Sequence, residues 1–148
     1  MQLSEHFNLD EFTTSQKATE KQIDNTQVTP EIIEHLRMLA ITLEQVRSLL
    51  GGHPLHISSG YRCLALNRAI GSGDTSAHVR GYAADFTCPS FGTPKEIAKK
   101  LSESNIKFDQ VINEITWVHI SAVPGNRRDL RTAVFHKGSK TTYLPGLV

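Results

Sequence analysis

The sequence predicts an α+β fold with a central antiparallel sheet and flanking helices. Segments with the periodicity of helices and of strands are mixed along the chain, and gaps of hairpin length separate the later strand segments. The 148 residues, 39% of them apolar, suit one hydrophobic core and leave little room for a second. We therefore expect residues 1–148 to form a single domain.

The N-terminal part of the chain predicts an anchor followed by a surface segment. Within residues 4–12, Phe7, Leu9 and Phe12 can pack against the rest of the domain, and the polar residues 13–29 are expected to run over the surface. The chain does not begin with a charged region followed by an apolar run, and no stretch of eighteen apolar residues occurs. We therefore expect a cytoplasmic protein without a signal peptide or a membrane span.

The strongest helical pattern follows Thr29. This residue can cap a helix, and Pro30 suits the first helical position. Apolar residues then recur at helical spacing, at Ile32, Leu36, Leu39, Leu43, Val46 and Leu50. Because Gly51 and Gly52 stop the pattern, we expect one long amphipathic helix between Thr29 and Gly51.

Shorter elements follow the long helix. Apolar and polar residues predict strands over residues 55–58, 82–87, 107–113 and 116–122. Helical spacing predicts helices over residues 61–70 and 93–101, the first of them with a buried side formed by Leu64, Leu66 and Ile70. The residues between Gly71 and Ser76 are expected to form a flexible loop.

Charge and short motifs exclude several classes of function. The 16 Lys and Arg residues against 15 Asp and Glu give a net charge of +1, so no basic field indicates nucleic-acid binding. The stretch from Gly125 onward is more basic, with five Lys or Arg residues and one Asp. We expect this stretch to be a solvated edge, with contact to an anionic polymer as the alternative. The motifs HExxH, paired CxxC and GxSxG do not occur. The sequence therefore lacks the motifs that indicate thermolysin-like proteases, zinc fingers and serine hydrolases.

Asp85 and His119 lie on strand faces that point away from the predicted core. In residues 82–87 apolar side chains alternate with Asp85, and in residues 116–122 they alternate with His119. His78 lies in the loop that leads into the first of these strands. We therefore expect two imidazoles and one carboxylate to share an open cleft.

These three side chains suit a zinc site. Two histidines and a carboxylate are typical ligands of Zn²⁺, and they leave a fourth position for water, as a catalytic site requires. The small residues Gly81, Ala83 and Ala84 allow a substrate to approach closely. A sulfur ligand from Cys63 or Cys88 stays open as an alternative, although both are expected to be small buried residues.

Four motifs follow one another between Ser58 and Ser121, in a resemblance that covers the chain from about Leu3 to Ser121. They are Ser58-Ser59-Gly60-Tyr61-Arg62 with Asn67, Ser76-x-His78-x-x-Gly81-x-Ala83-x-Asp85, Phe108-Asp109-Gln110, and Trp117-Val118-His119-Ile120-Ser121. Together they resemble the motifs of the zinc D-alanyl-D-alanine carboxypeptidase family, and in particular its small phage-borne peptidoglycan peptidases. The resemblance implies the hedgehog/D,D-peptidase-like form of the α+β fold.

The resemblance also implies a metal site and a set of substrate-binding residues. His78, Asp85 and His119 are the expected ligands of Zn²⁺. Arg62 is expected to face the substrate, where it can stabilise the oxyanion or grip a substrate carboxylate. The cleft offers three more candidates for substrate contact, namely Ser76, Gln110 and Trp117. The alternatives for these three are a loop cap, an ordinary polar strand residue and partial burial in the core.

The catalytic base is expected to be an acidic residue upstream of His119. The dipeptidase branch of the family has a glutamate three residues before the last histidine, where this chain has Thr116. The nearest carboxylate is that of Glu114, which we expect to accept the proton from water that the metal has acidified. Asp109 is the alternative, with a structural hydrogen bond as its simpler role.

The implied function is that of a zinc peptidase that hydrolyses the stem peptides of bacterial peptidoglycan, either as an endolysin-like endopeptidase or as a D,D-carboxypeptidase. Such an enzyme acts on the cell wall after release from the cytoplasm, or is carried in a virion. We expect a monomer that binds neither nucleic acid nor membrane. Two alternatives stay open: a zinc-stabilised binding module without activity, and a phage-tail component that docks on peptidoglycan.

Overall fold

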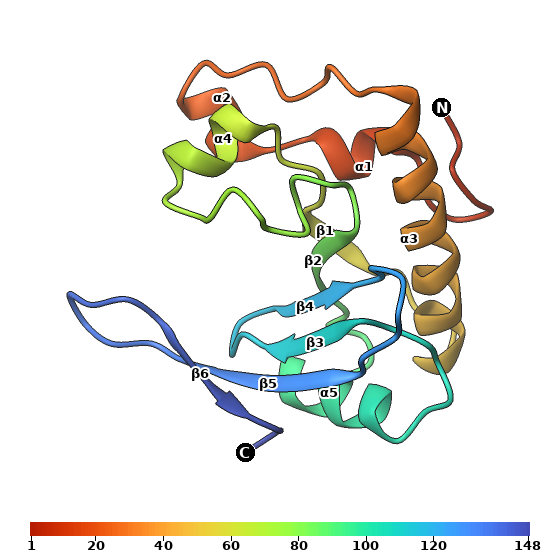
Figure 1. Cartoon of the computed structure of the whole chain (residues 1–148). Coiled ribbons are helices and arrows are strands. Elements are labelled where there is room, and N and C mark those ends of the chain that lie inside the picture. Colours follow the sequence, from red (N-terminus) through yellow and green to blue (C-terminus); the bar gives the residue numbers. More distant parts are fainter.

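The computed structural model describes residues 1–148 as five helices and six strands (Figure 1). The helices are α1 (Leu9–Thr13), α2 (Gln16–Glu20), α3 (Pro30–Leu49), α4 (Leu64–Ala69) and α5 (Pro94–Ser102). The strands are β1 (His56–Ser59), β2 (Ala83–Thr87), β3 (Gln110–Asn113), β4 (Val118–Ser121), β5 (Asp129–Val134) and β6 (Thr142–Pro145). The predicted α+β class is confirmed. None of the helices combines the length and the apolar character needed to cross a membrane.

The six strands form one sheet in the order β1-β2-β4-β3-β5-β6. All neighbours are antiparallel except β3 and β5, which are parallel, so the prediction of a purely antiparallel sheet is wrong at this pair. After β4 the chain crosses to the opposite side of β3 and forms β5 there. Because the chain reverses direction between β3 and β4 and again between β4 and β5, β5 runs parallel to β3. The hairpin of β5 and β6 projects from the body of the molecule (Figure 1).

Strands β5 and β6 were not predicted, for different reasons. β5 is an inner strand between β3 and β6, but it begins with the charged residues Asp129 and Arg131, and its two buried residues, Thr132 and Ala133, are adjacent and do not alternate. β6 is an edge strand, and all four of its residues are exposed. An edge strand needs no buried side to form its backbone hydrogen bonds, so its sequence carries little of the usual signal.

The hydrophobic core lies on one face of the sheet, between the strands and helices α3 and α5. Five of the six apolar residues predicted on the long helix are fully or almost fully buried, whereas Ile32 is partly buried against the core; the five are Leu36, Leu39, Leu43, Val46 and Leu50. They meet strand residues of the same core, among them Ala84, Phe86, Val111, Val118 and Ile120. Since neighbouring strand residues point to opposite faces, the other face of the sheet is left free for polar side chains.

The starts of the two core helices agree with the sequence prediction. The Thr29 side chain accepts a hydrogen bond from the backbone N–H of Ile32, and Pro30 occupies the first turn of α3. Thr93 and Glu96 form a reciprocal capping box at α5. These local signals fix where each helix begins and therefore which of its faces meets the sheet.

The N-terminal half differs from the prediction in two places. The segment expected to run over the surface contains α2, and the anchor contains α1, both too short to show clear helical periodicity. Helix α4 is shorter than expected, and Leu64 and Ile70 are each 38% exposed, so only Leu66 of its three predicted core residues is buried. The predicted anchor itself is confirmed, because Phe7 and Phe12 are buried.

Gly60 allows the end of β1 to approach the backbone of α1. A Cβ atom at Gly60 would lie 2.7 Å from the Cα atom of Phe12 and 2.8 Å from its carbonyl oxygen. The same carbonyl accepts a hydrogen bond from the backbone N–H of Tyr61, at 2.8 Å. Only glycine fits at this position, because a side chain would clash with backbone atoms of α1, which cannot move aside as a flexible side chain could.

We predict that Gly60→Ala lowers the free energy of unfolding by about 1–3 kcal/mol, the usual cost of overpacking. Urea denaturation followed by circular dichroism measures the change. Gly73→Ala is the control, because no atom lies within 4 Å of a Cβ built there, and its free energy of unfolding should change by about 0.5 kcal/mol or less. Equal urea concentrations at the unfolding midpoints of the two variants would contradict the steric role of Gly60.

Candidate metal and catalytic site

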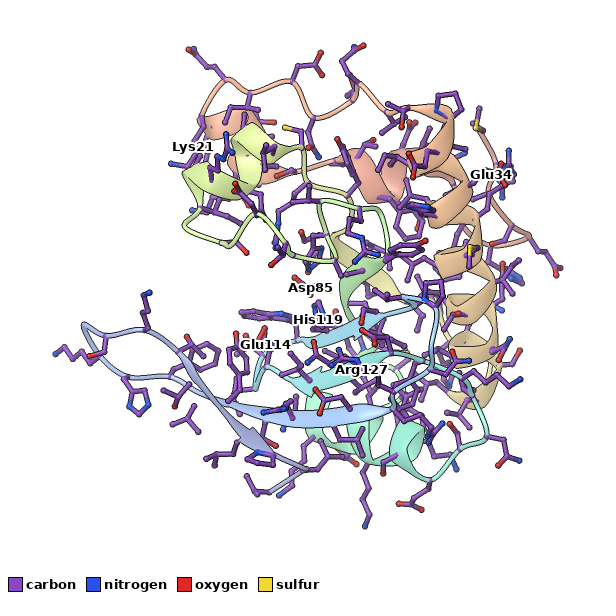
Figure 2. All side chains as sticks on the ribbon, viewed as in Figure 1. Lys21, Glu34, Asp85, Glu114, His119 and Arg127 are labelled. Atoms are coloured by element: carbon purple, nitrogen blue, oxygen red, sulfur yellow. The ribbon has the colours of Figure 1, made fainter.

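A cavity of about 750 Å³ lies on the sheet face opposite α3 and α5. Its lining comes from strands β2 to β6, from the turn between β3 and β4, from the segment between β4 and β5, from the loop between α4 and β2, and from Arg62 before α4. Asp85, His119 and Glu114 lie together near the centre of the molecule, whereas Lys21 and Glu34 lie at its periphery (Figure 2). The residues proposed from the sequence for catalysis, metal binding or substrate contact line this one cavity, except for the alternative sulfur ligands Cys63 and Cys88, which lie outside both the cavity and the metal cluster.

The register of β2 and β4 places Asp85 directly beside His119. The two residues are Cα partners in the antiparallel ladder, and both side chains leave the sheet on the cavity face. His119 Nδ1 lies 3.0 Å from Asp85 Oδ1. The alternation of polar and apolar residues in the two strands thus places Asp85 and His119 together on the cavity face, as the sequence predicts.

His78 reaches the same carboxylate oxygen from the loop before β2. Its Nε2 atom lies 3.3 Å from Asp85 Oδ1, and its Nδ1 atom lies 2.7 Å from the carbonyl oxygen of Gly60. Since a carbonyl only accepts hydrogen bonds, Nδ1 carries the proton and Nε2 is left free to bind a metal. The side chain is almost fully buried, so its orientation is firmly held.

The three residues fit a divalent metal ion. One ligand atom from each of His78, Asp85 and His119 lies within 4.8 Å of the other two. Burial lowers the pKa of His78, which keeps the imidazole neutral, as a ligand must be. Burial alone would raise the pKa of Asp85, but the adjacent imidazoles hold it well below its ordinary value, so the carboxylate is ionised. Two nitrogens and one oxygen are a donor set that suits Zn²⁺.

The turn between β3 and β4 presents Glu114 to the cavity. Ile115 adopts the left-handed conformation with φ 71°, its backbone N–H donates to Asn113 Oδ1, and the N–H of Glu114 donates to the carbonyl of Trp117. Glu114 is only 8% exposed, and its Oε1 atom has no hydrogen-bond partner. Burial, reinforced by the negative charge of Asp85, raises the pKa of Glu114. A buried carboxyl group with a raised pKa is suited to taking up and releasing a proton near neutral pH.

Asp109, the alternative base, is engaged elsewhere. Its two carboxylate oxygens accept hydrogen bonds from Arg127 Nε at 2.6 Å and Arg127 Nη2 at 3.1 Å, and Ser121 Oγ donates a third at 2.9 Å. The bonds from Arg127 hold the pKa of Asp109 below its ordinary value. A carboxylate so stabilised in its ionised form is a poorer proton acceptor than Glu114.

Arg62 lines the cavity and is held by a buried asparagine. Its Nε atom donates to Asn67 Oδ1 at 3.0 Å, while Asn67 Nδ2 donates to the carbonyl of Gly73 at 2.7 Å. Burial lowers the pKa of Arg62, although an arginine remains charged in a protein. Asn67 thus links the guanidinium to the loop after α4. Asn67 is part of the first motif found in the sequence, but its contact with Arg62 could not be predicted from that motif.

The three candidates for substrate contact differ in how free their polar groups are. Ser76 Oγ accepts a hydrogen bond from the backbone N–H of His78 at 3.3 Å, and Gln110 Nε2 donates to Asp129 Oδ2 at 2.8 Å. The Trp117 ring packs against Phe135 with centroids 6.2 Å apart, and its Nε1 has no partner. Ser76 and Gln110 therefore already have partners within the protein, whereas the indole N–H of Trp117 does not.

Several residues of the C-terminal part line the cavity without having been singled out. They are Arg127, Arg131 and Tyr143. The sequence signal was the excess of basic residues after Gly125, which the analysis interpreted as a solvated edge. The interpretation holds for solvation, because the side chains of Arg127 and Arg131 are 62% and 40% exposed, but it missed that both residues line the cavity.

Comparison with known proteins supports one family. Residues 5–121 match the family described as Peptidase M15, and the match covers more than half of the chain. No curated protein matches the sequence.

We predict that the protein binds one equivalent of Zn²⁺ and that His78→Ala, Asp85→Ala and His119→Ala each abolish this binding. Zinc present at 100 times its dissociation constant should add about 2.7 kcal/mol to the stability of the wild type and nothing to that of the variants. Metal analysis after dialysis and thermal unfolding measure both effects. His53→Ala, which alters an exposed histidine outside the cluster, should behave like the wild type; full zinc binding by the Asp85 variant would contradict the ligand set.

In the metal-free protein, Glu114→Gln should be more stable than the wild type at pH 7.5, by about 0.5–2 kcal/mol. A carboxyl group with a raised pKa in the folded state costs stability once it ionises, so the advantage should disappear below the pKa of about 4.3 that glutamate has when unfolded. Urea denaturation across this pH range tests the prediction. Glu5→Gln, whose side chain is 84% exposed, should show no such dependence on pH.

Proposed function

Because the chain belongs to the Peptidase M15 family of zinc metallopeptidases, we propose that it hydrolyses the stem peptides of bacterial peptidoglycan. The observation that carries the proposal is the convergence, in one cavity, of a zinc-binding cluster and the buried carboxyl group of Glu114, whose Oε1 atom has no hydrogen-bond partner. Residues 1–148 act as one catalytic domain in this proposal, since a single core includes Leu3, the central strands and, at its margin, Leu147.

His78, Asp85 and His119 would hold the zinc ion. Zinc at this position supplies Lewis acidity, which polarises the peptide carbonyl and makes water acidic enough to attack at neutral pH. Glu114 accepts the proton that this water loses. It then delivers the proton to the amide nitrogen as the C–N bond breaks, so that one carboxyl group and one amine leave the site.

Arg62 stabilises the negative charge that develops on the carbonyl oxygen during attack. Its guanidinium is oriented in advance by Asn67, which lowers the reorganisation needed in the transition state. Removal of one such donor typically costs a factor of about 10²–10³ in turnover. A loss confined to KM would instead assign Arg62 to ground-state binding of a substrate carboxylate.

The proposal covers two reactions that differ in the bond cut. An endopeptidase cuts within the stem peptide or its cross-link, as endolysins do, and a D,D-carboxypeptidase removes the terminal D-alanine. The resemblance of the motifs to those of phage-borne peptidases favours the first, with the enzyme released from the cytoplasm or carried in a virion. The protein acts as a monomer in this proposal.

Digestion of purified peptidoglycan tests the function directly. The zinc-loaded wild type should release fragments that mass spectrometry assigns to one peptide bond. Glu114→Ala should keep one equivalent of zinc but lose turnover by a factor of about 10² or more, because the proton acceptor is gone.

Asp109→Asn is the matched control, since it removes the cavity carboxylate that is neither a proposed zinc ligand nor the proposed base. It should retain turnover, and activity lost in Asp109→Asn but kept in Glu114→Ala would transfer the role of base to Asp109. A wild type that binds zinc and peptidoglycan without releasing fragments would overturn the enzyme proposal in favour of a binding module.

A further inference from the structure

A row of side chains crosses the sheet from the proposed metal site to β5. Asp85 pairs with His119, His119 with Ile112, and Ile112 with Arg131. Residues directly opposite each other on neighbouring strands share a face, and strands lie about 4.8 Å apart. The Arg131 position is therefore two strands, on the order of 10 Å, from that of His119. Arg131 lies beyond the segment 5–121 that matches the family.

The guanidinium of Arg131 is oriented at one edge and free at the other. Its Nε atom donates to the two carboxylate oxygens of Asp129, at 3.2 and 3.1 Å, and Gln110 Nε2 also donates to Asp129. No hydrogen bond engages the terminal nitrogens of Arg131, although its side chain is only 40% exposed and lines the cavity. Asp129 thus fixes the direction of the side chain without using the two nitrogens best suited to bind an anion.

The other arginines of the cavity are held differently from Arg131. Arg127 forms a two-bond ion pair with Asp109, and Arg62 is held by Asn67 beside the proposed zinc site. Arg80 lies over the ring of Tyr82, 5.0 Å from its centroid, and no carboxylate orients its guanidinium. Arg131 is therefore the cavity arginine that a carboxylate orients while Nη1 and Nη2 both remain free, at a distance from the proposed chemistry.

We propose that Arg131, positioned by Asp129, binds a free carboxylate of the substrate and makes that carboxylate a requirement for efficient cleavage. The planar fork of an arginine matches a carboxylate with two parallel hydrogen bonds, which an uncharged carboxamide does not reproduce. This inference rests on the proposed function and adds the substrate class: peptides with an unblocked carboxylate away from the scissile bond.

The row of paired residues also indicates where the carboxylate lies. An extended peptide advances about 3.3 Å per residue, so about 10 Å corresponds to roughly three residues from the carbonyl under attack. Stem peptides that carry a free side carboxylate at this separation fit the site. Peptides whose carboxylates are amidated lack the charged partner of Arg131.

Two synthetic stem peptides test the proposal, one with free side carboxylates and one in which these groups are carboxamides. Cleavage is measured with the zinc-loaded wild type, Arg131→Ala and Arg131→Lys. Binding is measured by calorimetry with the metal-free proteins, so that it does not depend on turnover. Circular dichroism confirms that each variant is folded, and Arg131→Lys retains the charge while losing the fork.

For the carboxylate peptide, Arg131→Ala should raise KM and the dissociation constant about 10- to 100-fold, as expected for a hydrogen-bonded charge pair. Arg131→Lys should recover only part of the loss. For the carboxamide peptide, neither variant should differ from the wild type. The key readout is thus the ratio of the dissociation constants, and of the KM values, for the two peptides. A general loss of structure would affect both peptides alike and leave this ratio unchanged.

Equal effects of Arg131→Ala on both peptides would overturn the role of Arg131 and leave the peptidase function intact. Equal cleavage of both peptides by the wild type would do the same. If the wild type cleaves neither peptide but binds the carboxylate form in a manner that depends on Arg131, the recognition inference holds and the proposed hydrolysis fails. The two proposals are therefore tested separately.

Discussion

The antiparallel pairing of β2 with β4 is the constraint on which the rest of the site depends. It places Asp85 and His119 side by side, and a shift of one residue in either strand would turn one of the two side chains into the core. The apolar residues that alternate with them, such as Phe86 and Ile120, oppose that shift because they are fully buried beneath α3 and α5. The packing of one face of the sheet thus fixes the chemistry of the other.

The cavity gathers charges that are unfavourable without partners, and the chain provides partners for most of them. Asp109 has Arg127 and Ser121, Arg62 has Asn67, and the Asp85 carboxylate has two imidazoles beside it. Glu114 is the exception, since its Oε1 atom is buried without a partner. Such an exception in a well-packed protein is characteristic of a group retained for function at a cost in stability.

The sequence was most informative where one residue pattern had only one structural solution. The alternation around Asp85 and His119 predicted which side chains share the cavity face, and Thr29 with Pro30 predicted the start of α3. The hydrogen bond from His78 to Gly60 joins residues 18 positions apart and has no local pattern that reveals it. β6 was not predicted because it lies at the edge of the sheet with all its residues exposed, and the inner strand β5 was not predicted because it begins with the charged residues Asp129 and Arg131.

Gly60 links helix α1 to the proposed metal ligand His78. Its missing Cβ admits the backbone of α1, while its carbonyl oxygen accepts the hydrogen bond that orients His78. Any interaction that favours the docked position of α1 must therefore also favour the arrangement of His78, and by thermodynamic reciprocity an ion bound at the cluster strengthens the docking of α1. The N-terminal anchor is in this sense a remote determinant of metal affinity, and resistance of residues 1–13 to proteolysis becomes a measure of how fully the metal site is formed.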